Sequence, residues 1–226
     1  VITPNDGCEP VKTRAGQILM AIGRRPDVSR LLGKDISLDM KDGKIAVNSD
    51  FETSEPGVYA IGDVAARTQL AHVAAAQGTY VVEKIAGRPH SIKLEVVPNG
   101  MFVSLPIVPN CIYTDPEIAT VGITEEIAKT CGLKVRCGHF SMRDNGKSII
   151  TGEEHGFIRL LFEAYSNTIV GAQMMCPRAT DMIGEIATAI ANGLTAQEMS
   201  FAMRAQPTYN EGIGAAIEDA MRHDPV

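Results

Sequence analysis

The sequence predicts a chain of two parts, an α/β region over residues 1–95 and an α+β domain over residues 96–226. Short apolar runs and one helical pattern share the first part, as in an α/β arrangement. A proline-rich, irregular stretch over residues 88–110 then interrupts the pattern. After it, several strand patterns precede two long helical patterns without steady alternation, which favours an α+β domain.

The elements of the first part are short and are punctuated by glycine and proline. Apolar runs at residues 17–22 and 58–61 are typical of buried strands. A hairpin turn and a strand are expected over residues 42–47, because an Asp-Gly pair opens this stretch. Residues 70–86 have the spacing of a helix with one face of mostly small residues, so another group could approach its backbone closely.

The second part contains four strand patterns and three helical patterns. The strands are expected near residues 109–113, 134–140, 157–163 and 168–175, and the helices near 124–130, 179–192 and 209–222. The last two strands form a predicted hairpin. Each of the two late helices has an apolar face that must cover the sheet or another subunit. We expect these faces to contribute to self-association, with packing on their own sheet as the alternative. These faces consist of Met182, Ile183, Ile186 and Ile190, and of Ile213, Ala216, Ile217, Ala220 and Met221.

The composition argues against several classes of protein. The formal net charge of -6 disfavours a nucleic-acid partner, which would reward a basic face. No apolar run approaches the roughly 20 residues of a membrane span, and no signal peptide is visible, so we expect a cytoplasmic protein without a membrane partner. Five cysteines show neither C-x-x-C nor zinc-site spacing, which indicates free buried thiols and no metal site. They are Cys8, Cys111, Cys131, Cys137 and Cys176.

Gly62 and Asp63 follow the apolar run at residues 58–61 directly. A carboxylate at the end of a buried strand lies where α/β sheets bind their ligands. An acceptor-only Asp suits a polyol hydroxyl, and a glycine lets a ligand come close to the backbone. By turn chemistry alone, the same pair could be a turn in which the Asp caps the next helix.

Several stretches together resemble the pyridine nucleotide–disulfide oxidoreductases, and within them most the dihydrolipoyl dehydrogenases. The stretch 53–63 resembles the second FAD fingerprint of this family, and residues 18–26 resemble the strand that returns from the NAD domain. Residues 113–122 and 170–183 resemble its interface domain. The resemblance implies an α/β nucleotide-binding remnant followed by an α+β interface (dimerisation) domain. It also implies a homodimer formed through residues 96–226.

The resemblance assigns expected roles to individual residues. Asp63 matches the Asp that binds the ribityl chain of FAD. Leu70, Ala71 and His72 match the helix start whose backbone lies beside the flavin ring. The His72 side chain itself could have no ligand. The parent enzyme would pass electrons between a dithiol and NAD through FAD, with components of 2-oxo acid dehydrogenase or glycine cleavage systems as partners.

The last motif departs from the family pattern. Related enzymes end in His-Pro-Thr-x-x-Glu, in which the His is the base for the dithiol and the Glu orients it. Here the His position holds Gln206, while Pro207, Thr208 and Glu211 match. A carboxamide cannot take up a proton near neutral pH, so Gln206 cannot act as the base. Glu211 alone could serve as a helix cap, because Thr-x-x-Glu ahead of an apolar pattern is a capping box.

The FAD-binding G-x-G-x-x-G and the redox C-x₄-C of the family do not occur in these 226 residues. We therefore expect this chain alone to be inactive and to bind FAD weakly or not at all. Two alternatives stay open at this stage. One is a non-catalytic dimerisation fragment, and the other is a soluble transhydrogenase-type flavoprotein, which needs no thiol base.

Overall fold

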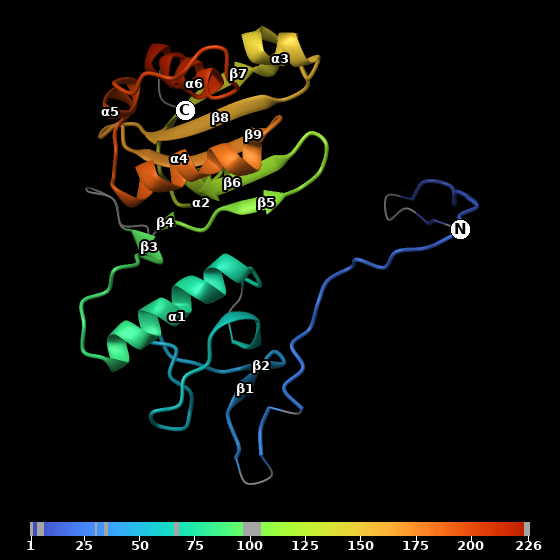
Figure 1. The fold of residues 1–226 in the computed structure, drawn as a ribbon, viewed down its shortest axis with the longest axis vertical. Helices are drawn as coiled ribbons and strands as arrows, with labels where there is room; N and C mark the ends of the chain where they lie inside the picture. The colour runs from blue at the N-terminus through green and yellow to red at the C-terminus, as the bar shows by residue number, and fades with distance from the viewer. Residues whose placement is uncertain are drawn as a thin grey trace. The chain divides into compact units, whose positions relative to one another are not determined.

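The computed structural model describes residues 2–3, 7–29, 31–33, 36–65, 68–96 and 105–223. The chain divides into two compact units, Val1–Gln69 and Leu70–Val226 (Figure 1). The division lies directly before the predicted helix at residues 70–86, which thus belongs to the second unit. The boundary that we placed between residues 95 and 96 stays a prediction.

The first unit contains one β-hairpin and a small core. Strands β1 (Met40–Lys41) and β2 (Lys44–Ile45) pair in antiparallel fashion. The two turn residues between them, Asp42 and Gly43, have φ of 54° and 75°, as a tight two-residue hairpin turn requires. The predicted hairpin is confirmed. A short 3-10 helix, η1 (Gly62–Val64), follows later in the unit, and the core consists of Leu38, Ile45 and Ala60.

The two predicted buried strands of this unit are wrong. Residues 17–22 are in no strand, and Ile18, Leu19 and Ile22 are 87%, 90% and 88% exposed. Residues 58–61 form only an isolated bridge, Glu52 to Tyr59. An apolar run becomes a buried strand only where a neighbouring strand completes its hydrogen bonds. Residues 17–22 have no such neighbour among the described residues, whereas residues 58–60 pair only with the short segment 51–53, through Thr53 N to Val58 O and Ala60 N to Phe51 O.

The second unit opens with helix α1 (Ala71–Ile85), which confirms the helix predicted at residues 70–86. Its buried side consists of Val73, Gln77 and Val81, one helical turn apart. The face of mostly small residues points elsewhere, and Ala71, Ala75 and Val82 on it are exposed. The backbone at the start of α1 is therefore open to a close approach.

A five-stranded antiparallel sheet forms the centre of the second unit, in the order β5-β6-β9-β8-β7. Strands β8 and β9 form the predicted hairpin, with Ile158 opposite Met174 and Leu160 opposite Ala172. A separate pair, β3 and β4, precedes the sheet. The bounds are β3 (Glu95–Val96), β4 (Leu105–Pro106), β5 (Asn110–Ile112), β6 (Ile118–Gly122), β7 (Val135–Ser141), β8 (Phe157–Glu163) and β9 (Ile169–Met175).

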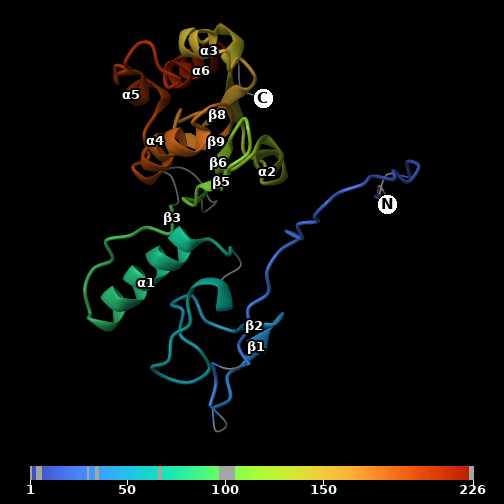
Figure 2. The same ribbon diagram turned by 45° about the vertical axis from the view of Figure 1, so that its right-hand side comes forward.

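Helices lie on both faces of this sheet, as Figure 2 shows with α4 and α6 on one side and α2 on the other. Helix α4 packs on β6 and β9, while α6 packs on β7 and β8. The bounds are α2 (Glu125–Thr130), α3 (Gly146–Thr151), α4 (Ala179–Ala191), α5 (Ala196–Ser200) and α6 (Glu211–Arg222), with a 3-10 turn η2 (Met142–Asp144) before α3. The α+β architecture expected from the sequence is confirmed.

The apolar faces of the two late helices are buried within the chain itself. Met182, Ile183, Ile186 and Ile190 of α4 are at most 4% exposed, and Ile213, Ala216, Ile217 and Ala220 of α6 at most 1%. They pack on their own sheet, so our expectation that these faces meet a second subunit is wrong. Met221, at 49% exposure, is the exception. A sequence pattern cannot say which apolar layer a face will meet.

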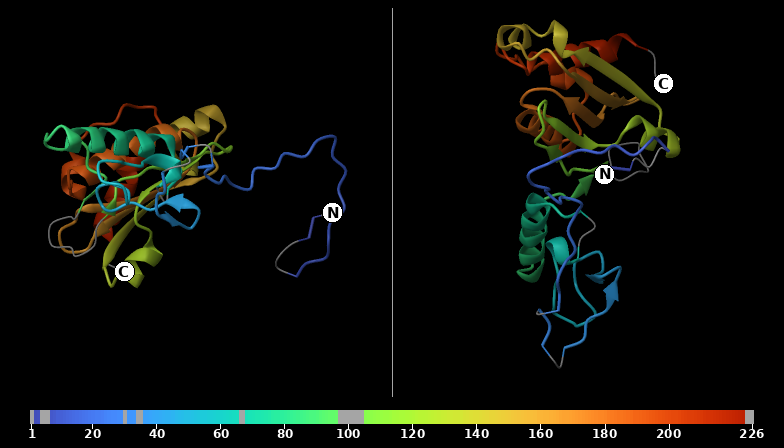
Figure 3. Two further views of the ribbon diagram at one scale, coloured as in Figure 1. Left: turned by 90° about the horizontal axis from the view of Figure 1, so that it is seen from below. Right: turned by 90° about the vertical axis from the view of Figure 1, so that its right-hand side faces the viewer.

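The sequence predicted none of five elements of the second unit: strands β3, β4 and β6 and helices α3 and α5. Strand β6 lies between β5 and β9 in the sheet. Helix α5 is short but begins with a complete capping box formed by Thr195 and Glu198. The right-hand view of Figure 3 shows α3 and α6 at the same end of the second unit. Among the described residues, no helix is both long enough and apolar enough to cross a membrane.

Candidate functional site

Asp63 lies at the point where the backbone leaves its extended course. Ile61 is extended, with φ -132° and ψ 168°, and the chain then turns into η1. Gly62 makes this turn with φ 68°, a left-handed conformation that a side chain would strain. Asp63 follows in the first turn of η1, with its side chain 37% exposed. The turn therefore presents the carboxylate at the surface of the unit.

Arg24 is the partner of this carboxylate. Its Nη2 atom lies 3.3 Å from Asp63 Oδ2, and it also donates to the carbonyl of Gln69 at 3.3 Å. The second oxygen, Oδ1, makes no hydrogen bond to any other residue in the described ranges. A ligand hydroxyl could donate to that oxygen, so the geometry at Asp63 fits the polyol chain of FAD.

The start of α1 fits the second flavin contact in a different way. The N-cap residue Leu70 is extended and has no side chain that could cap the helix. The first amides of a helix lack partners within it, so they can face a ligand. The His72 ring does not face outward as a free ligand: its Nε2 atom lies 2.9 Å from the carbonyl oxygen of Pro109.

The two predicted flavin contacts lie in different units of the structure. Gly62 and Asp63 belong to the first unit, and Leu70, Ala71 and His72 belong to the second. Each part is locally suited to a flavin. Their assignment as one cofactor site stays a prediction.

The segment before α6 contains the other predicted site residues. Thr208 N donates to Glu211 Oε2 at 2.9 Å, which is one half of the predicted capping box. The other half does not form, because α6 begins at Glu211 with Asn210 as its N-cap residue and no side chain caps it. The Thr208 hydroxyl donates instead to the carbonyl of Ala205 at 2.6 Å. The buried Asn145 side chain, 2% exposed, donates to the carbonyl of Thr208 at 3.0 Å. This segment is thus anchored to the N-cap of α3.

A buried arginine anchors the same segment to α4. The Arg204 side chain is 10% exposed and donates from Nη2 to Glu185 Oε1 at 2.6 Å. The other carboxylate oxygen of Glu185 accepts from Asn210 Nδ2 at 3.2 Å. Glu185 therefore joins both ends of the segment that holds Gln206.

Gln206 and Glu211 line one cavity of about 650 Å³, together with Arg204. The structure thus brings together the two residues that occupy the His and Glu positions of the family motif. Gln206 is exposed, and the peptide bond that joins it to Pro207 is cis. Its carboxamide can donate and accept hydrogen bonds there, but it cannot exchange a proton.

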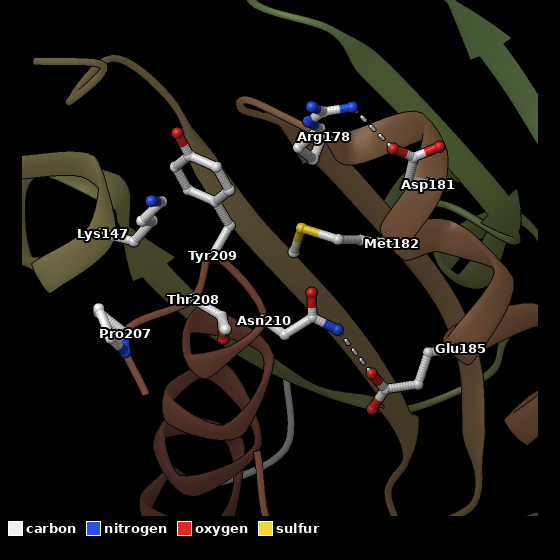
Figure 4. A pocket seen from close by; sticks show the side chains of 9 residues that line it. All are labelled: Lys147, Arg178, Asp181, Met182, Glu185, Pro207, Thr208, Tyr209 and Asn210. Atoms are coloured by element: carbon white, nitrogen blue, oxygen red, sulfur yellow. Dashed lines mark hydrogen bonds and ion pairs between the residues drawn. The ribbon is translucent and has the colours of Figure 1, made fainter. Parts of the chain in front are cut away.

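A second cavity of about 390 Å³ lies beside the same segment (Figure 4). Figure 4 draws Tyr209 with Lys147 of α3 and Arg178 at the start of α4, all lining the cavity. The Tyr209 hydroxyl bonds to Thr151 Oγ1 at 2.9 Å and to the Glu153 carboxylate. Burial and the bond to Glu153 raise the pKa of Tyr209 above its ordinary value. Tyr209 is therefore a protonated donor, not a base.

None of the five cysteines forms a disulfide, as expected, but only Cys176 is buried, while Cys8 and Cys131 are exposed. Burial raises the pKa of Cys176 to about 12, with the Glu117 charge adding to the effect. Burial also raises the pKa of Cys137 to about 12, helped by a hydrogen bond to Glu125. Both thiols stay protonated near neutral pH and are poor nucleophiles. The described residues contain no group of three or more possible metal ligands.

Sequence reasoning missed the residues that hold the site residues in place. Arg24 lies in a stretch that resembled a return strand, with no sign that it pairs with Asp63. Asn145 and Glu185 are distant in sequence from the segment that they anchor, by 63 and 25 positions. Arg204 is close to Gln206, yet its burial depends on packing that no local pattern reveals.

Comparison with known proteins identifies the family. Residues 3–78 match the pyridine nucleotide-disulphide oxidoreductases, and residues 108–217 match the dimerisation domain of the same family. The chain is 35% identical over 209 residues to a dihydrolipoyl dehydrogenase of Bacillus subtilis and 34% identical over 208 residues to that of Geobacillus stearothermophilus. Both alignments cover 92% of this chain but 42% of the relative, so the chain spans less than half of these relatives.

Solved structures agree with this fold. LpdA from Mycobacterium tuberculosis has a TM-score of 0.77 and 26% identity, over 90% of this chain and 42% of that one. The flavoprotein disulfide reductase RclA from Escherichia coli has a TM-score of 0.74 at 18% identity, over 88% of this chain and 43% of that one, which is a likeness of fold alone. With both parts of the chain matched by one family, the chain belongs to the pyridine nucleotide–disulphide oxidoreductases and includes their dimerisation domain.

Proposed function

We propose that this chain is the C-terminal portion of an FAD-dependent NAD(P)–disulfide oxidoreductase of the dihydrolipoyl dehydrogenase kind. The parent enzyme passes electrons between a dithiol and NAD through FAD. The observation that carries the proposal is the position of Asp63, which follows the positive-φ Gly62 and whose Oδ1 atom has no hydrogen-bond partner among the described residues. The names of the matched relatives support the same chemistry.

In this proposal, FAD supplies the redox chemistry when it is bound, and the residues of this chain hold it. Asp63 accepts a hydrogen bond from the ribityl chain, while Arg24 fixes the orientation of the carboxylate. The open backbone at Leu70, Ala71 and His72 faces the flavin ring, where the positive end of the α1 dipole favours electron density. The chain alone binds FAD weakly and is inactive, because the rest of the cofactor needs contacts that these residues do not supply.

The segment at Gln206 is rigid but lacks the base. Glu211 is already engaged as a cap for Thr208 N, which suits a residue that orients its neighbour and not one that takes up protons. General-base catalysis contributes about 10²–10⁴-fold, so dithiol oxidation with Gln206 in place is slow. Gln206 therefore also favours a second candidate, a transhydrogenase-type flavoprotein that moves hydride between nicotinamides without a thiol base.

Several finer statements belong to the same proposal. The dimerisation domain supports a homodimer formed through residues 96–226. A non-catalytic dimerisation fragment is the alternative for this chain by itself. Components of 2-oxo acid dehydrogenase or glycine cleavage systems are the proposed partners of the parent, and a cytoplasmic location is its proposed site of action.

The test uses the complete protein encoded by the gene and the 226-residue chain in parallel. The chain alone should lose its yellow colour on dialysis, while the complete protein should keep flavin absorbance. Asp63→Ala in the complete protein should raise the Kd for FAD about 10- to 100-fold, as the loss of a hydrogen bond to a charged group predicts. Asp39→Ala, at another exposed carboxylate of the same unit, is the matched control. An unchanged Kd in Asp63→Ala would refute the assignment.

A further inference from the structure

A side chain joins the first turn of α1 to the five-stranded sheet of the second unit, which is here called the interface sheet. His72 Nε2 lies 2.9 Å from the carbonyl oxygen of Pro109. A carbonyl oxygen only accepts, so Nε2 must carry the proton and donate. Both the neutral Nε2–H tautomer and the imidazolium meet this condition. The bond therefore does not depend on the charge of the ring.

The acceptor lies directly before a strand of the five-stranded sheet. Pro109 directly precedes Asn110, the first residue of β5, and Asn110 pairs with Thr120 of β6. The sheet order makes β5 an edge strand whose other neighbour is missing within the described residues. The His72 ring thus fastens the start of α1 to the beginning of this edge strand.

The start of α1 has no cap of its own, because Leu70 offers no acceptor side chain. Beyond the end of α1, Lys93 Nζ lies 3.4 Å from the carbonyl of Ala191 at the end of α4. Contacts in the first turn of α1 and beyond its end thus join this region to the sheet domain. These ties agree with α1 belonging to the second unit.

We infer that His72 is a positioning residue that fixes the flavin-facing turn of α1 to the interface sheet. Its ring faces the protein and its backbone faces the cofactor, which separates the two roles within one residue. The link makes the flavin environment depend on the dimerisation domain. The cofactor side of this inference rests on the proposed function, whereas the anchor itself rests only on the contact with Pro109.

The test begins with hydrogen exchange on the 226-residue chain, which needs no flavin. The amides of residues 74–77 report on the first turn, because they are the first that helix geometry bonds back to preceding carbonyls. His72→Leu should raise their exchange rates about two- to tenfold, the range expected for one net hydrogen bond. His72→Gln retains an N–H donor of similar reach and should restore slow exchange. Thr79→Val, which loses only a bond within α1, should leave these amides unchanged.

The flavin part is measured in the complete protein. His72→Leu should raise the Kd for FAD about two- to tenfold and shift the flavin absorbance bands, and His72→Gln should reverse both effects. Unchanged exchange in His72→Leu, or a His72→Gln variant as defective as His72→Leu, would overturn the anchor. Altered exchange with an unaltered Kd and spectrum would overturn the coupling to the flavin. If the unmodified complete protein binds no flavin, the proposed function fails, and the exchange data still decide the anchor.

Discussion

Gly138 of β7 lies so close to α6 that its replacement by alanine, which adds one methyl group, should displace the helix. A Cβ atom at this position would lie 1.9 Å from the carbonyl oxygen of Ala216 and 2.8 Å from the Ala220 Cβ. The obstacle is helix backbone, which cannot rotate away as a side chain would. Helix α6 would have to move by about 1.5 Å to restore ordinary contact.

The expected cost of Gly138→Ala follows from this geometry. Insertion of an extra carbon into a packed core typically costs about 1–3 kcal/mol, and a clash with backbone belongs at the upper end. Because alanine lowers the conformational entropy of the unfolded chain relative to glycine, it offsets up to about 1 kcal/mol of this cost. The net loss in the free energy of unfolding should be about 2 kcal/mol. Because α6 begins at Glu211, the same shift should loosen the cap on Thr208.

Urea unfolding followed by circular dichroism measures this loss at a fixed protein concentration. With m of about 1–3 kcal/mol/M, the midpoint should fall by about 1 M. Gly184→Ala is the matched control, because Gly184 lies exposed in α4 with no atom within 4 Å of its Cβ position. That change should stabilise the chain by about 0.5–1 kcal/mol. Equal shifts in the two variants, or a loss below about 0.5 kcal/mol for Gly138→Ala, would refute the packing argument.

Four further substitutions test other features. Glu163 is 6% exposed and accepts from Ser166 N, Ser166 Oγ and Tyr165 N, so Glu163→Gln should cost about 1.5–3 kcal/mol at pH 7. Although burial opposes it, these bonds lower the pKa of Glu163. The free energy of unfolding of the wild type should therefore begin to decrease when the pH is lowered below about 4.3, the ordinary pKa of a glutamate carboxyl group. The contribution of Glu163 should be lost as the pH drops through its folded-state pKa, and the variant should lack this pH dependence. Ile190→Asp should unfold the chain, since Ile190 is 1% exposed and an aspartate there would be buried without a partner. Met221→Asp should leave the circular dichroism spectrum unchanged, and it should lower the mass measured by light scattering if the dimer uses that surface. In the complete protein, Gln206→His should raise dihydrolipoamide oxidation about 10²–10⁴-fold at steady state, and no gain would point to another base.

The local patterns that predicted correctly are those in which a few neighbouring residues decide the outcome. The Asp42-Gly43 turn needs only two residues that tolerate positive φ. The helix at α1 and the β8–β9 hairpin follow from spacing over one segment. The α+β class of the second part also follows from the order of such segments, which is written along the chain.

The main failures concern what an apolar segment meets. Residues 17–22 have the composition of a buried strand and yet are exposed, because burial requires a partner that composition cannot supply. The apolar faces of α4 and α6 were correctly located, but their target was not: both pack on the sheet of their own chain. An apolar face in the sequence predicts that the face will be buried, but it does not predict which surface will bury it.

The same division runs through the candidate site. The sequence alone determined the identities at the motif positions, above all Asp63, Gln206 and Glu211, and with them which groups can accept a hydrogen bond and which can exchange a proton. Only the tertiary structure decided that Arg24 holds Asp63 and that His72 reaches Pro109. The physical reason is distance along the chain: chemistry is a property of each side chain, whereas these contacts join residues 39 and 37 positions apart that only folding brings within 3.5 Å.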